Sequence, residues 1–83
     1  MRTMVDSTDI REVFGQVLRA QRLKTGSSQE KLALQAGMDR TFVSMLERGK
    51  RQPTLTSLFA LSEQLGVTPS TLLQRVEKSL PND

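Results

Sequence analysis

The side chains best suited to chemistry lie together on one face of a short helix predicted between Asp39 and Arg48. This face carries cationic, hydroxyl and thioether groups from Arg40, Thr41, Ser44, Met45 and Arg48. The opposite face carries the apolar residues Phe42, Val43 and Leu46. A helix of this kind can lie in a DNA groove while its apolar face packs on the rest of a small protein.

The distribution of charge supports a polyanionic partner. Between Arg19 and Arg51 there are eight basic and three acidic residues, a balance of +5. The rest of the chain has four basic and six acidic residues, a balance of −2, so the net charge is +3. A hydrated charged surface is the alternative, but the concentration of basic residues beside the predicted helix favours nucleic acid.

Composition argues against several functions. The chain has no cysteine and no histidine, so it lacks disulfides, thiolates and the commonest general base and metal ligand. No carboxylate pair is spaced as an acid–base couple, so we expect no enzyme, no cofactor and no metal site. Without tyrosine or tryptophan, and with its three phenylalanines expected in the core, it lacks a stacking platform for single strands. No apolar run approaches the roughly 20 residues of a membrane span, which predicts a soluble cytoplasmic protein.

Five short helices are predicted, and they make one all-α domain. Residues 1–8 are expected to be a flexible tail, residues 9–79 the folded domain and residues 80–83 a C-terminal tail. Asp9 is the predicted cap of the first helix, which has a stripe of Ile10, Val13, Phe14, Val17 and Leu18 and ends near Gly26. Gly15, inside this helix, costs about 1 kcal/mol relative to alanine, and it indicates that another element approaches closely.

The other helices begin at their own predicted caps, which are Ser27 or Ser28, Asp39, Thr54, and Thr68 followed by Pro69. The fourth helix is expected to carry an apolar stripe of Leu55, Leu58, Leu61 and Leu65. About three residues around Gly37 separate the second helix from the third, so these two helices must cross at a steep angle. This geometry is that of a helix-turn-helix, although an ordinary helical corner is the alternative.

A series of motifs runs through most of the chain. They are Gly15-x-x-Leu18-Arg19-x-x-Arg22, Ser28-Gln29-x-x-Leu32-Ala33, Gly37, Phe42-Val43-Ser44-x-Leu46-Glu47-x-Gly49, Pro53-Thr54-Leu55 and Leu65-Gly66-Val67. Together they resemble the repressor/Cro family of helix-turn-helix proteins, also called the xenobiotic-response-element (XRE) family. Asp39-Arg40-Thr41 and Leu46–Pro53 also resemble the short controller proteins of restriction–modification systems. The resemblance implies a lambda-repressor-like DNA-binding domain.

The resemblance assigns base-reading roles to Arg40, Thr41, Ser44 and Met45. Arginine can bond guanine O6 and N7, and threonine can bond either base type or touch a thymine methyl group. Contact of Arg40 with phosphate and partial burial of Met45 are the alternatives. Ser44 is short and reaches a base only if the helix sits deep in the groove.

Further matches imply contacts with the DNA backbone and one structural pair. The backbone set is Gln29, Arg48, Lys50, Arg51 and Gln52, whose contacts would supply affinity without reading sequence. An amide at Gln29 adds to the anion site that a helix N-terminus already offers. An exposed glutamine and a hydrated basic turn are the alternatives. Arg22 and Glu47 match a pair that joins the first helix to the end of the third and fixes the tilt of the reading helix.

Apolar residues near the C-terminus predict self-association. Five short helices cannot easily bury every leucine, so a dimer interface is expected from Leu65, Leu72, Leu73 and Val76. A two-fold dimer through this patch would place two reading helices about 34 Å apart, in successive major grooves. The prediction is therefore a homodimeric transcriptional regulator on a palindromic operator in double-stranded DNA, such as a restriction–modification controller or a Cro-like regulator, without a small-molecule effector domain. A protein-interaction module with the same fold, such as an antitoxin or adapter, is the alternative.

Overall fold

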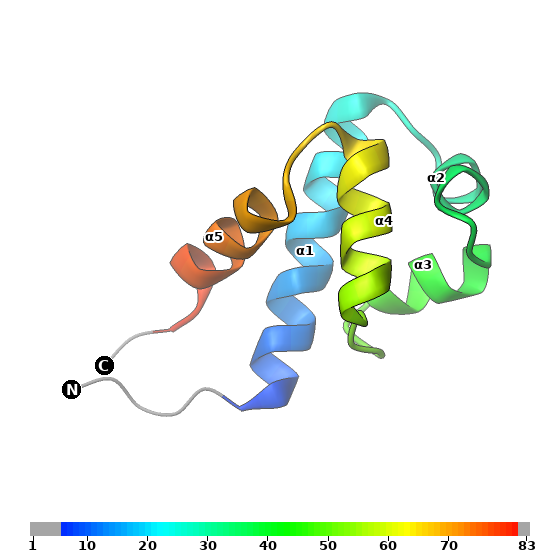
Figure 1. The fold of residues 1–83 in the computed structure, drawn as a ribbon. Coiled ribbons are helices and arrows are strands. Elements are labelled where there is room, and N and C mark those ends of the chain that lie inside the picture. The colour runs from blue at the N-terminus through cyan, green and yellow to red at the C-terminus, as the bar shows by residue number, and fades with distance from the viewer. Residues whose placement is uncertain (1–5, 82–83) are drawn as a thin grey trace.

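The computed structural model describes residues 6–81 and shows five α-helices (Figure 1). In chain order they are α1 (Ser7–Thr25), α2 (Gln29–Ala36), α3 (Arg40–Glu47), α4 (Leu55–Leu65) and α5 (Pro69–Ser79). No strand occurs within residues 6–81, and the all-α prediction is confirmed. The parts of the expected tails at residues 1–5 and 82–83 lie outside the described residues.

Serine or threonine caps begin three of the helices. Their side-chain oxygens accept the backbone N–H of the residue three positions later at 3.0 to 3.1 Å, and the caps are Ser28, Thr54 and Thr68. The Ser57 Oγ atom also accepts a hydrogen bond from the Thr54 N–H at 2.8 Å, which completes a capping box. Of the two serines predicted to begin α2, Ser28 is therefore the cap.

The start of α1 differs from the prediction. Asp6 caps the helix, because its Oδ1 accepts the N–H groups of Thr8 and Asp9 at 2.7 and 3.2 Å. Asp9 is thus a residue of the first turn and not the cap, and Ser7 and Thr8 belong to α1 rather than to a tail. The sequence offers an aspartate at both positions, and the apolar stripe that indicates the helix begins only at Ile10.

All five helices contribute to one core. Its buried apolar residues are Phe14, Leu18, Leu32, Ala33, Val43, Leu46, Leu58, Leu61, Leu65, Leu72 and Val76. Helix α1 packs against α3 and α5, and α2 packs against α3 and α4. Figure 1 shows α2 and α3 on one side of α1 and α4, with α5 on the other side. None of the described helices is long and apolar enough to cross a membrane.

Two large apolar side chains of α4 are exposed, although Leu55 belongs to the predicted apolar stripe and Phe59 was expected in the core. Leu55 is 75% exposed and Phe59 is 61% exposed. As the first residue of α4, Leu55 lies ahead of the buried part of that helix, which begins at Ser57. Leu55 is therefore the exposed member of the predicted stripe, whereas the three leucines that follow it are buried. At the C-terminal end, half-buried Leu80 packs against the core and is not part of a tail.

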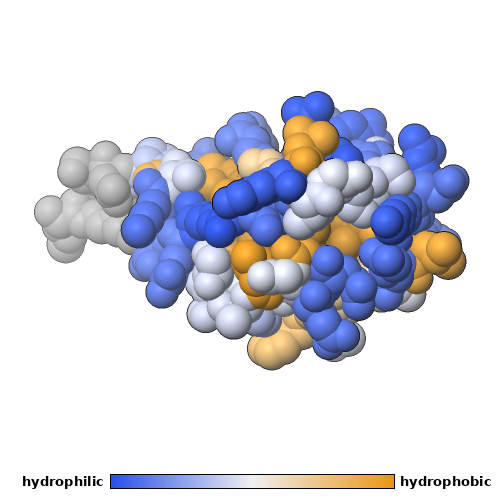
Figure 2. Space-filling model, turned by 90° about the horizontal axis from the view of Figure 1, so that it is seen from above, coloured by the Kyte–Doolittle hydropathy of each residue, from blue (hydrophilic) through white to orange (hydrophobic). Residues whose placement is uncertain are grey.

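Exposed apolar groups form small patches on an otherwise polar surface. Seen from above, most side chains are hydrophilic and the apolar ones lie in separate groups (Figure 2). The exposed large apolar residues are Leu23, Leu34, Leu55, Phe59 and Leu73. They come from four different helices, so an interface between copies would have to combine residues of more than one helix.

Candidate nucleic-acid interface

Helices α2 and α3 form the steep corner that the sequence predicts. Three residues separate them, and Gly37 has a φ of +72°, a conformation that L side chains rarely adopt. The N–H groups of Gly37 and Met38 donate to carbonyls of α2 at 3.3 and 2.9 Å, which ends the helix sharply. In Figure 1, α2 is seen end-on whereas α3 lies across the view. This arrangement is a helix-turn-helix.

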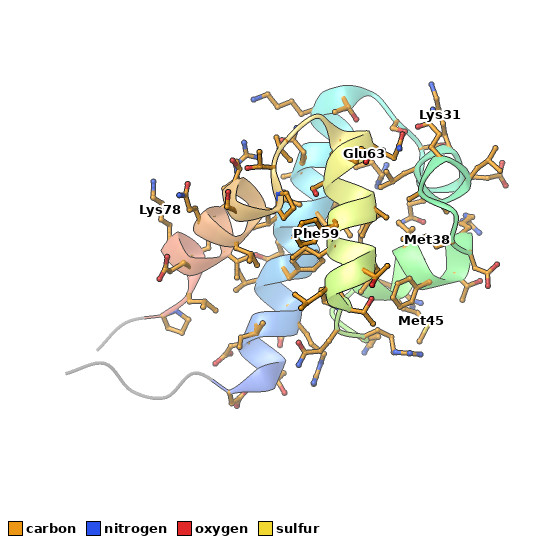
Figure 3. All side chains as sticks on the ribbon, viewed as in Figure 1. Lys31, Met38, Met45, Phe59, Glu63 and Lys78 are labelled. Atoms are coloured by element: carbon orange, nitrogen blue, oxygen red, sulfur yellow. The ribbon has the colours of Figure 1, made fainter. Side chains whose placement is uncertain are left out.

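The predicted reading face of α3 is not uniform. Arg40 and Thr41, at the start of the helix, are exposed, whereas Ser44 and Met45 are half-buried. Met45 extends from the lower side of α3 in Figure 3. The Ser44 carbonyl also accepts a long bond from the Arg48 side chain at 3.4 Å. A ligand can therefore reach the first two side chains fully and only the outer edges of the other two.

Asp39 occupies the N-cap position of α3, but its side chain accepts no cap hydrogen bond. The predicted N-cap residue is therefore confirmed, and the backbone there has the extended conformation of a cap, but the expected side-chain bond is not formed. The first N–H groups of a helix have no partner within the helix. At this exposed end of α3, no Asp39 side-chain bond satisfies them.

A buried ion pair joins the other end of α3 to α1. The Arg22 Nε and Nη2 atoms donate to the two carboxylate oxygens of Glu47 at 2.6 and 2.9 Å, and the side chains are 10% and 2% exposed. The hydrogen bond to Glu47 raises the pKa of the Arg22 guanidinium, although burial acts in the opposite direction. Arg22 Nη1 also donates to the Ser27 carbonyl at 2.9 Å. The predicted pair is formed, with both carboxylate oxygens engaged.

Gln29 is tied to the same carboxylate, which the sequence did not predict. Its Nε2 donates to Glu47 Oε1 at 2.9 Å. An amide nitrogen has two N–H donors, so this bond leaves one donor for another acceptor. Because Arg22, Gln29 and Glu47 come from α1, α2 and α3, these three helices meet at one buried carboxylate.

Gly15 allows α3 to approach the backbone of α1. A Cβ atom at this position would lie 2.5 Å from the Leu46 carbonyl oxygen and 2.6 Å from that of Glu47. Backbone oxygens of a packed helix cannot move aside as a flexible side chain could, so only glycine fits. The prediction that Gly15 marks the close approach of another element is confirmed.

The loop after α3 exposes four of the five predicted phosphate-binding residues. They are Arg48, Lys50, Arg51 and Gln52. The guanidinium of Arg51 lies over the ring of half-buried Phe42, 5.8 Å from the ring centroid, a cation–π arrangement. Phe42 therefore supports a residue of the loop in addition to packing against the core.

Three of the four predicted dimer residues are core residues. Leu65, Leu72 and Val76 are only 1%, 0% and 6% exposed, so they offer no surface to a second copy and the prediction is wrong for them. They are buried because α5 packs on both α1 and α4. Leu73 is 48% exposed and remains available.

A polar contact between helices, which the sequence did not reveal, also fixes α5. Buried Gln21 donates from Nε2 to the Leu65 carbonyl at 3.0 Å and accepts a bond from Arg75 Nη1 at 2.7 Å. Gln21 thus joins α1 to the end of α4 and to α5. Its only sequence signal is its position, three residues after Leu18 on the apolar stripe of α1.

Comparisons with known proteins agree with this geometry. A family model described as helix-turn-helix matches residues 18–72. Control protein C.BamHI of Bacillus amyloliquefaciens is 44% identical over 68 residues, which cover 81% of this chain and 84% of that protein. Control protein C.MunI of a Mycoplasma species is 44% identical over 71 residues, covering 84% and 96%. The crystal structure of the restriction–modification controller protein C.AhdI from Aeromonas hydrophila is similar with a TM-score of 0.73 and 41% identity, covering 77% of this chain and 96% of that one.

Proposed function

The chain belongs to the helix-turn-helix family of DNA-binding transcriptional regulators, and we propose that it binds a palindromic operator as a homodimer and acts as a restriction–modification controller. The names of its relatives support the controller role. The observation that carries the proposal is the construction of α3. Its end at Glu47 is bonded to α1 and α2, while Arg40 and Thr41 at its other end are exposed.

The reading face of α3 supplies the base contacts in this proposal. Exposed Arg40 donates to guanine O6 and N7, and exposed Thr41 bonds a base edge or contacts a thymine methyl group. Ser44 and Met45 are half-buried, so they contact bases only where the groove comes closest to α3. Their contribution to discrimination is therefore smaller than that of Arg40.

Two segments beside α3 hold the DNA backbone. Gln29 offers its second amide N–H to a phosphate at the start of α2, while its first N–H remains on Glu47. The loop contributes the exposed residues Arg48, Lys50, Arg51 and Gln52. Phosphate contacts of this kind position the protein on the duplex and make its affinity depend on salt.

A surface that differs from the predicted one forms the dimer. Leu73 remains from the predicted set, and exposed Leu55 and Phe59 add to it from α4. Leu55 and Phe59 are four residues apart, so they share one face of the helix. Helix α4 follows the loop after α3. A two-fold axis beside the start of α4 would therefore bring the α3 helices of the two copies close together. Half-sites one helical turn apart, about 34 Å, require that proximity.

Light scattering after size exclusion tests the dimer. We expect Phe59→Glu to halve the molar mass. The circular dichroism spectrum should not change, because Phe59 is exposed on the surface of a single copy and does not hold the fold together. Leu34→Glu is the matched control, since Leu34 is an exposed apolar residue of α2 outside the proposed surface, and it should remain dimeric. A monomeric wild-type protein, or a dimeric Phe59→Glu variant, would contradict this interface.

Titration with duplex DNA at several salt concentrations tests the proposed function itself. We expect affinity to fall steeply with salt, and a selected operator to bind at least about 1,000-fold more tightly than an unrelated duplex. Weak binding that is independent of salt and shows no preference among sequences would reject DNA recognition. That result would favour the protein-interaction module instead.

A further inference from the structure

We propose that the first turns of α1 supply an additional binding site for a DNA phosphate, centred on Arg11. The site is a pocket of about 390 Å³ between α1 and the loop after α3. Its lining residues are Thr8, Arg11, Glu12, Arg48, Gly49 and Lys50. This inference rests on the proposed function, because its ligand is a phosphodiester group of the bound duplex.

Charge gathers at this pocket from two distant parts of the chain. Arg11 belongs to α1, whereas Arg48 and Lys50 follow α3. With these three cations and the single carboxylate of Glu12, the formal charge of the lining is +2. Cations brought together in this way repel one another, and an anion that enters the pocket relieves that repulsion.

The fold holds the loop against α1 at this pocket. Gly49 is buried and has a φ of +73°, and a Cβ atom there would lie only 3.1 Å from the Cα and Cγ atoms of Glu12. A larger residue would push the loop away from α1 and separate the cations. The close contact at Gly49 therefore keeps Arg48 and Lys50, on either side of it, beside the first turns of α1.

Hydrogen bonds to α1 and to the loop orient the Arg11 side chain. Its Nη2 donates to Thr8 Oγ1 at 3.1 Å, and its Nε makes a longer bond of 3.4 Å to the Gly49 carbonyl. The guanidinium is half-buried and held between α1 and the loop. A guanidinium is planar and always charged, and its fork of N–H donors matches the geometry of a phosphate. Holding it in place beforehand lowers the entropy cost of binding.

The position of the pocket identifies the ligand as a phosphate of the DNA strand. Arg48 and Lys50 line the pocket and also belong to the loop proposed to hold the backbone. A strand of B-DNA presents a phosphate for every 3.4 Å of helix axis. A strand that passes Lys50 therefore brings a neighbouring phosphate towards α1. Arg11 extends the backbone contact from the loop to the first helix.

The salt dependence of DNA binding by the 83-residue chain tests this site. The probe is a duplex of mixed sequence about two helical turns long, roughly 21 base pairs, because the contact is independent of sequence. We expect Arg11→Gln to reduce the slope of log affinity against log salt by about 0.9. Between 50 and 200 mM salt, the wild-type protein should then lose about 3- to 4-fold more affinity than this variant.

Two further variants separate the contact from other effects. Arg11→Lys keeps the charge and should retain most of the slope. Lys78→Gln also removes one cation, but Lys78 lies on α5, on the side of the molecule away from α3 (Figure 3), and its slope should equal that of the wild type. Thermal unfolding of each variant checks that the fold is intact.

Each outcome decides the proposal. An Arg11→Gln slope equal to that of the wild type would overturn the site even if affinity falls. Arg11 would then only support the Gly49 loop and would make no phosphate contact of its own. An equal loss of slope in Lys78→Gln would also overturn it, since the effect would then be one of net charge. If the wild-type protein binds no duplex at all, both this site and the proposed function fail. Wild-type binding with an unchanged Arg11→Gln slope rejects only the site.

Discussion

The two ends of α3 are built in opposite ways. At the C-terminal end, Glu47 is buried and bonded to α1 and α2, and the last carbonyls lie against Gly15. At the N-terminal end, Asp39 makes no side-chain cap bond, and Arg40 and Thr41 are exposed. A helix fixed at one end and open at the other can meet a groove at a defined tilt. In the function that we propose, stability and recognition therefore depend on different residues of one short helix.

Removal of the anchor should have the largest effect. We expect Arg22→Ala to lower the free energy of unfolding by about 3–5 kcal/mol, because it leaves the buried Glu47 carboxylate without its cation. Urea denaturation followed by circular dichroism measures the loss. Arg19→Ala is the control, since Arg19 is an exposed arginine of the same helix and should change stability by less than about 0.5 kcal/mol. Equal effects of the two substitutions would show that the pair does not anchor α3.

A methyl group between α1 and α3 should have the next largest effect. We expect Gly15→Ala to destabilise the protein by about 1–3 kcal/mol, because its Cβ overlaps backbone oxygens. This loss occurs even though alanine favours a helix by about 1 kcal/mol relative to glycine. Thermal or urea unfolding provides the measurement, with exposed Gln16→Ala as the neutral control. A stabilised Gly15→Ala variant would mean that α3 can move away from α1 without cost.

The sequence predicts the anchored end of α3 better than its surroundings. Gly15 is visible because a mid-helix glycine has few alternative uses, whereas the Arg22–Glu47 pair is implied by the resemblance to a known family. The bond from Gln29 to Glu47 depends on where α2 meets α3, and neither helix alone carries that information. Leu55 shows a similar limit, since it continues an apolar stripe although nothing buries it.

The helix ends and the dimer surface show why local patterns are insufficient. Asp6 and Asp9 can each begin α1, and only the bonds that are formed distinguish them. Leu72 and Leu73 are adjacent leucines, yet one is buried and the other is half exposed, because of the way α5 lies on α1 and α4. Periodicity locates a helix and its general apolar side. The packing of neighbouring helices decides which leucines remain on the surface.

Changes at the open end should alter recognition and leave stability almost unchanged. We expect Arg40→Ala to reduce discrimination at one base pair of each half-site by about 1–3 kcal/mol. Its unfolding free energy should change by less than about 0.5 kcal/mol, since the side chain is exposed. Competition binding with single-base operator variants measures the discrimination.

Lys50→Ala is the matched comparison for Arg40→Ala. Because it removes a proposed phosphate contact, it should weaken binding to all sequences alike and reduce the salt slope by about 0.9. A change of base preference in Lys50→Ala, or none in Arg40→Ala, would reverse the roles that we assign to these residues.

The smallest expected effect is at the contact between Phe42 and Arg51. We expect Phe42→Leu to weaken binding to every duplex by about 0.5–1 kcal/mol, because leucine keeps an apolar group but removes the ring beneath the guanidinium. A double-mutant cycle with Arg51→Gln measures the coupling between the two side chains. Additive effects of the two substitutions would show that the ring does not position Arg51 for DNA.

The central claim is tested most directly by selecting bound duplexes from a random pool. The selection is carried out in parallel with the wild-type protein and with Arg40→Ala. The claim is that the open end of α3 reads bases while its fixed end only aims the helix. We predict a two-fold symmetric consensus with half-sites one helical turn apart, and loss of preference at one base pair in each half-site for Arg40→Ala. An absence of enrichment, or an identical consensus for both proteins, would contradict it.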